Sequence, residues 1–293
     1  MTSALAPPAV IPSPTTSVWW LGPVPLRAYA LCILTGIAVA GWWTGRRLAA
    51  RGGRPGDVLD VALWGVPVGI VGARLYHVIT SPQAYFGPGG HPANALRIWD
   101  GGMGMWGGFA LGGVGAWVAC RRRGLSPLLF ADAAAPALAV AQAIGRLGNW
   151  FNNEVYGAAT DLPWGLRVYQ WDAGAGHAVR DAAGEPIVKG VVHPTFLYEV
   201  LWCALLALVI VGLERARRLR PGQAIALAIA GYCLGRFVVE LLRADEANRI
   251  LGVRVNTWVS ALVLAVGVGM YLRAGSRGSG ARADATQHAA PGR

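Results

Sequence analysis

Charged side chains are scarce in this sequence: Asp, Glu, Lys and Arg together make up only 14% of its 293 residues. Soluble domains carry about 25%. Hydrophobic residues make up 54%, and the mean hydropathy is +0.42. A soluble protein of this length needs a charged surface, and this chain has too few charges to make one. The composition therefore excludes an ordinary soluble domain and indicates an integral membrane protein.

Motifs that bind metal ions or form disulfide frameworks are also missing. The sequence has no CxxC pair, no Cys/His cluster and no HExxH motif, which disfavours a metal-dependent protease. Its four cysteines stand singly in or beside apolar runs: Cys32, Cys120, Cys203 and Cys233. Single cysteines of this kind are typical of helix packing. We expect neither a zinc site nor a disulfide framework.

Acidic residues are few, since 15 Asp and Glu stand against 26 Lys and Arg and give a net charge of +11. A basic balance is compatible with nucleic-acid binding. Here, however, the arginines cluster between apolar stretches, which is how membrane topology is set. We therefore expect the lipid bilayer, and not nucleic acid, as a partner.

Seven stretches approach the roughly 20 apolar residues that a membrane-spanning helix needs. They lie at about 26–45, 58–79, 102–120, 127–147, 195–213, 222–242 and 254–272. The sequence therefore predicts an all-α integral membrane protein with about seven transmembrane helices in one catalytic domain, 26–273. Residues 1–25 are expected to form an N-terminal tail, and the Gly-, Ser-, Ala- and Arg-rich residues 274–293 a disordered tail.

The basic residues of the connections predict the orientation. Fifteen Lys and Arg follow the first, third, fifth and seventh stretches, against seven in the connections of the opposite side. The positive-inside rule then places the N-terminus outside and the C-terminus in the cytoplasm. The longest connection, 148–194, is extracytoplasmic in this topology. Its run LPWGLRVYQW at 162–171 favours a small cap with a β-hairpin.

Charged residues inside the predicted helices point to a polar cavity. An Arg at the bilayer centre costs about 2.5–3.5 kcal/mol on insertion scales, yet Arg74, Arg146 and Arg236 all fall inside predicted spans. In the predicted orientation they lie in the outer half of the membrane, which favours an anion-binding cavity there. The alternative is an ion-pair ladder within one helix, because Arg236, Glu240 and Arg243 share one face.

Two glycine-containing stretches stand out within the spans. The run GRLGNWFNNEVYG at 145–157 is too polar for an ordinary membrane helix, and such backbone is tolerated where it lines a cavity or leaves the bilayer. It is either part of a site or a plain helix end. The run GGMGMWGGFALGG at 101–113 has small residues at four-residue spacing, namely Gly104, Gly108 and Gly112. Either close helix packing alone explains it or the run also has a functional role.

The stretch 145–157 closely resembles the signature of the bacterial prolipoprotein diacylglyceryl transferases. Five further blocks resemble that family and occur in its order: GPVPLRAYA at 22–30, GARLY at 72–76, WDGGMGMWGG at 99–108, HPTFLYE at 193–199 and GYCLGRFVVELLR at 231–243. The resemblance implies a multi-pass enzyme of the bacterial plasma (inner) membrane. It would transfer the diacylglyceryl group of phosphatidylglycerol to the lipobox cysteine of a prolipoprotein, forming a thioether and releasing glycerol phosphate, without a metal or cofactor.

The resemblance also implies which residues act. Arg146 and Arg236 are expected to stabilise charge on the departing phosphate. Glu154 is expected to orient an arginine or to accept the thiol proton. Four further positions match functional positions of the family and are expected to bind substrate: Tyr29, Asn149, Gly157 and Glu240. Two more cations of the outer half are expected to do so as well: Arg74 and Arg243.

One position departs from the family. Many relatives have a histidine in the WDGGM block that is often proposed as the base, whereas this chain has Trp106. An indole cannot take up the proton, so we expect Trp106 itself not to be required. Glu154, His193 and His77 remain as candidates for the base, unless the cationic site itself lowers the pKa of the substrate thiol. His193 could equally cap the fifth helix.

A second class of function stays open at this point. A transporter or flippase for an anionic lipid or solute could use the same buried arginines without breaking a bond. Transporters more often have inverted repeats and polar residues at the bilayer midplane. This sequence has neither, which favours the enzyme.

Overall fold

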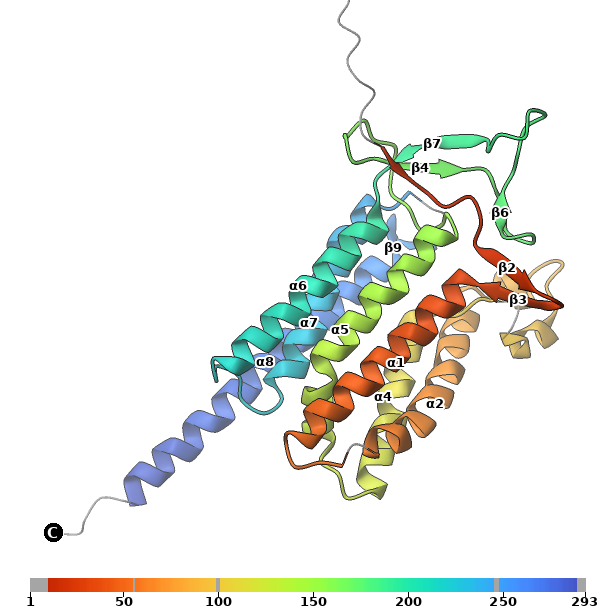
Figure 1. Ribbon diagram of the computed structural model, residues 1–293. Helices are drawn as coiled ribbons and strands as arrows, with labels where there is room; N and C mark the ends of the chain where they lie inside the picture. The colour runs from red at the N-terminus through yellow and green to blue at the C-terminus, as the bar shows by residue number, and fades with distance from the viewer. Residues whose placement is uncertain (1–9, 55, 99–100, 245–247, 289–293) are drawn as a thin grey trace, which may run out of the picture. The chain divides into compact units, whose positions relative to one another are not determined.

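The computed structural model describes residues 10–54, 56–98, 101–244 and 248–288, with side chains as far as Ser276. It divides into two compact units. The large unit consists of the residues up to 40 together with 135–293, and the small unit consists of residues 41–134. Helices α1 (Ala28–Ala49) and α5 (Pro127–Phe151) each contribute to both units. Figure 1 shows the elements of the chain.

Long helices make up most of the chain, as predicted. Besides α1 and α5 they are α2 (Asp57–Thr80), α4 (Met105–Arg122), α6 (Thr195–Arg215), α7 (Gln223–Leu242) and α8 (Val255–His288). Two short helical turns lie between α2 and α4, namely α3 (Gln83–Phe86) and the 3-10 helix η1 (Pro92–Leu96). Each long helix begins within three residues of a predicted span.

Six helices are long and apolar enough to cross a membrane: α1, α2, α5, α6, α7 and the part Val255–Ser276 of α8. Helix α4, the predicted third span, is not among them. Its 18 residues include five glycines and end in Arg121 and Arg122, which lowers its hydropathy. The chain is thus a mostly helical integral membrane protein with six candidate spans rather than seven.

Helix α8 extends beyond its predicted end at 272 and stays helical to His288. The glycine and serine content of 274–293 predicts disorder, but residues 274–288 continue the helix. Alanine, the strongest helix former, recurs in this segment and offsets the glycines. A prediction from composition therefore overestimates how far glycine and serine disfavour a helix in this segment.

Short strands of the large unit form one three-stranded sheet in the order β1 (Ile11–Pro12), β4 (Leu166–Tyr169), β7 (Val188–Val192). β1 pairs in parallel with β4, and β4 pairs antiparallel with β7. Val168 of β4 and Val192 of β7 are buried in one cluster with Phe196 of α6. The Phe196 ring stacks on Trp150 of α5, with the ring centroids 5.8 Å apart. This apolar cluster fixes the sheet over the ends of α5 and α6.

Three two-stranded hairpins are also present in the described part of the large unit: β2 (Val18–Leu21) with β3 (Val24–Arg27), β5 (Trp171–Asp172) with β6 (His177–Ala178), and β8 (Arg249–Ile250) with β9 (Val253–Arg254). The β5–β6 hairpin lies within the connection for which a hairpin is predicted. Asp172 at its turn accepts hydrogen bonds from the backbone N–H groups of Ala175 and Gly174, and these bonds lower the pKa of its carboxyl.

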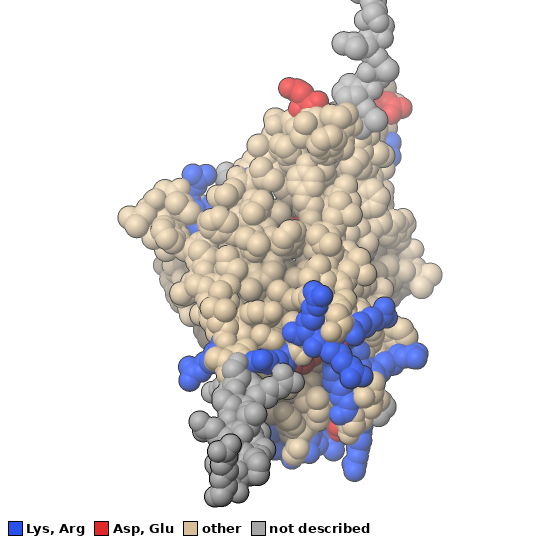
Figure 2. Space-filling view, turned by 90° about the vertical axis from the view of Figure 1, so that its left-hand side faces the viewer, with Lys and Arg blue, Asp and Glu red and all other residues tan. Residues whose placement is uncertain are grey.

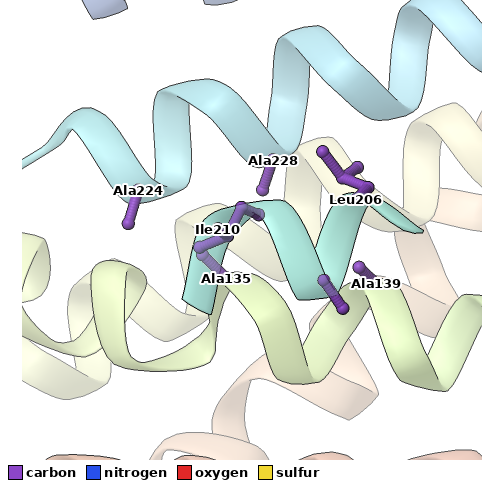
Figure 3. Close-up of a cluster of buried hydrophobic side chains, with 7 residues drawn as sticks. Ala135, Ala139, Leu206, Ile210, Ala224 and Ala228 are labelled. Carbon is purple, nitrogen blue, oxygen red and sulfur yellow. The ribbon is translucent and has the colours of Figure 1, made fainter. Parts of the chain in front are cut away.

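Helices α5, α6 and α7 of the large unit pack through small side chains. The buried cluster between them is drawn in Figure 3 and includes Ala135 and Ala139 of α5, Leu206 and Ile210 of α6, and Ala224 and Ala228 of α7. On α7, glycines make room for larger α6 side chains: Gly231 lies against Leu206 and Gly235 against Trp202. The three helices therefore approach closely enough for their polar residues to pair.

Helices α2 and α4 of the small unit pack glycine against glycine. A Cβ atom added at Gly72 would meet the carbonyl oxygen of Gly107, and one added at Gly107 would meet that of Gly72. A Cβ at Gly69 would lie 3.2 Å from the carbonyl oxygen of Gly108. Small residues of this kind let helix backbones approach in membranes. The close packing predicted for the run 101–113 is confirmed.

Large apolar side chains face outward along the candidate spans. Leu208 of α6, Leu241 of α7 and Leu262 of α8 are 71%, 64% and 67% exposed. On the face drawn in Figure 2, a broad area is covered by uncharged side chains. An apolar surface of this extent marks contact with a partner or a membrane, and on spanning helices that partner is lipid.

Gly107→Ala should destabilise the protein, because the added methyl group overlaps the backbone of α2 and overpacking typically costs about 1–3 kcal/mol. Thermal unfolding in detergent measures the effect as a lower Tm. Gly113→Ala on the same helix is the matched control, since its Cβ meets no described atom within 4 Å. Alanine is the better helix former, so this control should keep or raise the Tm. Equal Tm values for the two variants would contradict the packing.

Candidate functional site

Four arginines and two glutamates of the large unit meet at the ends of α5, α6 and α7. We name this group the arginine–glutamate chain, because its members pair in alternation: Arg146 of α5, Glu199 of α6, Arg236 and Glu240 of α7, Arg243 directly after α7, and Arg254 of β9. Four of the six are residues that the sequence predicts for the site.

Glu199 joins α5 to α7 through two arginines. Its Oε1 accepts a hydrogen bond of 2.8 Å from Nη1 of Arg236. Its Oε2 lies 3.0 Å from Nε of Arg146, close enough for an ion pair but without hydrogen-bond alignment. The side chains of Arg146, Glu199 and Arg236 are 12%, 5% and 5% exposed. One buried carboxylate therefore holds together the two arginines that are predicted to be catalytic.

Glu240 is completely buried and contacts three arginines. Its Oε2 lies 2.9 Å from Nη2 of Arg236 and 3.3 Å from Nη1 of Arg243. Its Oε1 accepts a hydrogen bond of 2.7 Å from Nε of Arg254. The ion-pair ladder along α7 that the sequence leaves open is therefore present. It is also joined to α6 through Glu199 and to β9 through Arg254, so it is part of a larger network.

The arginine–glutamate chain gathers four guanidinium groups around two carboxylates, and its side chains are at most 12% exposed. Nε of Arg236 has no hydrogen-bond partner among the described residues. A buried donor of this kind is costly without a partner. An anionic ligand would supply the missing acceptor.

Glu154 is an exposed carboxylate beside this chain. Arg146 donates from Nη1 to Oδ1 of Asn149 at 3.3 Å, and Asn149 donates from Nδ2 to Oε1 of Glu154 at 3.0 Å. Asn152 donates to the same oxygen at 3.2 Å. The polar stretch 145–157 thus links the buried Arg146 to an exposed carboxylate through Asn149.

Two tyrosines flank Arg146. Nη2 of Arg146 lies 3.4 Å from the Tyr232 hydroxyl. The Tyr29 ring packs against Gly148, where an added Cβ would lie 2.7 Å from its Cδ2 atom. Tyr29, predicted to bind substrate, therefore lies beside the cationic group.

Gly157 lies where three segments of the large unit come together. Its N–H donates to the His193 carbonyl at 3.0 Å, and the N–H of Ala158 donates to the Leu242 carbonyl at 3.0 Å. A Cβ at Gly157 would lie 2.7 Å from the Cβ of His193 and 2.9 Å from the Leu242 carbonyl oxygen. Only glycine allows this approach. Gly157 thus positions the backbone that carries Arg243.

The His193 imidazole contacts an aromatic pair. Its Nδ1 lies 3.2 Å from the Tyr198 hydroxyl, and that hydroxyl also accepts a hydrogen bond of 3.1 Å from Nε1 of Trp164. His193 does not cap α6, because the N-cap residue is Pro194 and no side chain caps this helix end. The capping role considered from the sequence is therefore wrong.

The small unit holds the other predicted candidates. Arg74 is 7% exposed and its guanidinium lies 5.2 Å from the Tyr85 ring centroid. Nδ1 of His77 lies 2.8 Å from the Tyr85 hydroxyl. Trp106 is 8% exposed, and its Nε1 has no hydrogen-bond partner among the described residues. The Arg74 donors go to five backbone carbonyl oxygens, those of Asn94, Ala95, Arg97, Gly101 and Gly102.

Sequence reasoning did not assign Glu199 and Arg254 to the site. A signal for Glu199 exists, since it is a carboxylate near the start of an apolar helix and such a group is rare unless it is paired. Arg254 directly precedes the last span, where an arginine is indistinguishable from one that sets topology. In the described part of the chain, no group of three or more His, Cys, Asp and Glu residues is placed to hold a metal ion.

Comparison with known proteins identifies the family of the chain. The sequence profile of the family described as prolipoprotein diacylglyceryl transferase matches residues 16–273. A phosphatidylglycerol–prolipoprotein diacylglyceryl transferase of Rhodococcus jostii (strain RHA1) is 52% identical over 281 residues, which is 95% of this chain and 78% of the relative.

Two further relatives carry the same name. That of Nocardia farcinica (strain IFM 10152) is 51% identical over 265 residues, 90% of this chain and 54% of the relative. That of Paenarthrobacter aurescens (strain TC1) is 51% identical over 277 residues, 94% of this chain and 87% of the relative. These names do not support the transporter or flippase alternative. The chain belongs to the prolipoprotein diacylglyceryl transferase family.

Proposed function

We propose that this protein transfers the diacylglyceryl group of phosphatidylglycerol to the lipobox cysteine thiol of a prolipoprotein. The observation that carries the proposal is the convergence of four buried arginines, together with an Arg236 Nε that has no acceptor among the described residues. Such a group suits the phosphate of an anionic lipid. The relatives named above are transferases for this lipid and this class of protein. The apolar helices fit a multi-pass protein of the bacterial cell membrane.

The proposed topology has seven spans, with α4 as the third, over a catalytic domain of 26–273. Contact of α4 with α2 through glycine backbone supports its place in the membrane. The N-terminal tail, 1–25, and a small cap, 148–194, are extracytoplasmic, and residues 274–293 are cytoplasmic. The arginine–glutamate chain then lies in the outer half of the membrane, within reach of lipid headgroups of the outer leaflet.

Arg146 and Arg236 bind the phosphate. Guanidinium groups pair with phosphate oxygens through two parallel hydrogen bonds. Glu199 holds both arginines in place through the contacts described above, and Glu240 orients Arg236 from the other side. As the bond between the glyceryl carbon and the phosphate oxygen breaks, negative charge grows on the leaving glycerol phosphate. Arginines that are already fixed stabilise this charge without reorganising.

The substrate thiol attacks the glyceryl carbon, so a C–S bond forms while the C–O bond breaks. The thiol proton goes to Glu154. This carboxylate lies beside the arginine–glutamate chain, is exposed, and accepts hydrogen bonds from Asn149 and Asn152. Glu199 and Glu240 are unsuited to that role because buried arginines occupy their oxygens. His193 is the alternative acceptor, since its imidazole is partly accessible. Trp106 cannot act as a base.

The remaining predicted residues support binding. Asn149 orients Glu154, Tyr29 hydrogen-bonds the substrate, Gly157 shapes the adjacent backbone, and Arg243 adds charge beside Glu240. Arg74 is assigned to holding residues 94–97 and 101–102, because its donors point at backbone carbonyl oxygens there.

Arg146→Gln and Arg236→Gln should each lower kcat for transfer by about 10²–10³, the usual effect of removing one donor that stabilises transition-state charge. The assay is turnover of phosphatidylglycerol with a lipobox peptide in proteoliposomes. Arg167→Gln is the control, because Arg167 is an exposed arginine on β4. Full turnover in both Arg146 and Arg236 variants would remove the site assignment.

Glu154→Gln should lower kcat at pH 7 by about 10²-fold, the low end for loss of a general base. The deficit should shrink as the pH rises past the thiol pKa of about 8.5, because the thiolate then forms unaided. The pH profile of kcat measures this, with Asp161→Asn as a control in the same connection. A pH-dependent loss in His193→Asn, together with a normal Glu154→Gln profile, would make His193 the base.

A further inference from the structure

The β2–β3 hairpin exposes apolar side chains on both of its faces. Trp19, Trp20 and Leu21 of β2 are 46%, 66% and 70% exposed, and Val24 and Leu26 of β3 are 53% and 37% exposed. Successive side chains of a strand point to opposite faces, so both faces of this hairpin carry exposed apolar side chains, with Arg27 at its base next to α1. The Trp19 and Phe151 rings pack in a T-shaped arrangement, with their centroids 6.1 Å apart. This contact holds the hairpin against the end of α5.

The β1–β4–β7 sheet of the same unit behaves differently. In β4 the buried Leu166 and Val168 alternate with the exposed Arg167. This is the pattern of a strand with one face on a core and one face in water. The β1–β4–β7 sheet is therefore suited to contact with water on one face. The β2–β3 hairpin lacks that pattern and is not suited to contact with water.

The β8–β9 hairpin repeats the feature at another helix. Ile250 and Leu251 are 55% and 88% exposed. Leu251 has a φ of +52°, a left-handed conformation that favours glycine or asparagine over leucine. A strained leucine at an exposed tip is unexplained by the fold of the hairpin itself. A contact between the Leu251 side chain and an apolar partner would explain why leucine occupies this position.

Both hairpins run directly into a candidate membrane span. β3 ends at Arg27 and α1 begins at Ala28, while β9 ends at Arg254 and α8 begins at Val255. A strand of four residues is about 13 Å long, so the tip of β2–β3 cannot lie far from the start of α1. In Figure 1 the two hairpins lie at the same end of the large unit, and β2–β3 turns away from the axis of α1.

We propose that the β2–β3 and β8–β9 hairpins lie in the interfacial layer of one membrane leaflet, with Trp19, Trp20, Leu21 and Leu251 in contact with lipid. In the proposed topology this is the extracytoplasmic leaflet. Tryptophan is enriched at this depth. The headgroup region also offers water to the open hairpin edges, which the hydrocarbon core would not.

Lipid fits the two surfaces better than a peptide does. Each hairpin continues an apolar surface that already faces the bilayer, with Leu31 and Leu34 of α1 46% and 61% exposed, and Trp258 and Leu262 of α8 49% and 67% exposed. Trp258 also donates from Nε1 to the Ile250 carbonyl at 3.2 Å, which ties the second hairpin to the first turn of α8. An exposed apolar hairpin occurs beside two separate spans, α1 and α8. A partner that contacts both surrounds the protein, as lipid does.

The test is depth-dependent quenching of a fluorophore. Leu21→Cys, Leu251→Cys and the control Ala183→Cys, an exposed position of the large unit in a polar turn, are each made in full-length protein whose four native cysteines are replaced by alanine. Each is labelled with an environment-sensitive dye and reconstituted in nanodiscs containing phosphatidylglycerol. Lipids with a nitroxide near the headgroup should quench the labels at 21 and 251 several-fold more than the label at 183.

Equal quenching at all three positions would overturn the proposal. It would also be overturned if the labels at 21 and 251 became protected from water only after a lipobox peptide was added, since the hairpins would then bind peptide. Because the three labelled proteins share one background and should show the same transfer activity, a folding defect would appear in all of them and not at one position.

Discussion

Pairing of guanidinium groups with carboxylates, in surroundings that hold little water, governs the architecture of the large unit. Glu199 and Glu240 each contact more than one arginine, and all members of the chain are largely buried. In such surroundings an unpaired charge costs several kcal/mol. Each pair therefore constrains the helices that carry it, and α5, α6 and α7 are held in one arrangement by charge as well as by the alanine cluster between them.

One buried donor of this group, Nε of Arg236, has no partner among the described residues. A bound anion that accepts from it would relieve the cost of burying that donor. Folding and ligand binding thus use the same groups. Small residues make this possible, because Gly157, Gly231 and Gly235 let helices and connecting backbone approach closely enough for the long arginine side chains to converge.

Much of this arrangement could be predicted from the residues alone. Helix starts follow from apolar runs that are limited by arginine clusters. The gathering of Arg146, Arg236 and Glu240 in one buried, paired group fits the cost of charge in a membrane. The third span was less predictable, since glycine in α4 serves packing while it lowers hydropathy. Continuation of α8 to His288 was missed because composition cannot weigh alanine against glycine.

Partners contributed by backbone or by distant segments could not be predicted. The carbonyl oxygens that receive the Arg74 donors leave no mark in the sequence, because every residue has a carbonyl group. Arg254 looks like an ordinary arginine before a span until β9 brings it to Glu240. Glu199 is recognisable as unusual, but its two partners lie on other helices, and only the packing of α5, α6 and α7 reveals them.

The order in which the members of the arginine–glutamate chain occur in the sequence has a consequence for biogenesis. A ribosome delivers Arg146 first, then Glu199, then Arg236 with Glu240 on one helix, and finally Arg254. Each arriving segment brings a counter-ion for a group already inserted, and the pair within α7 can enter the translocon neutralised. No stage of synthesis has to leave a long row of like charges in the lipid, although the last carboxylate contact forms only when β9 emerges.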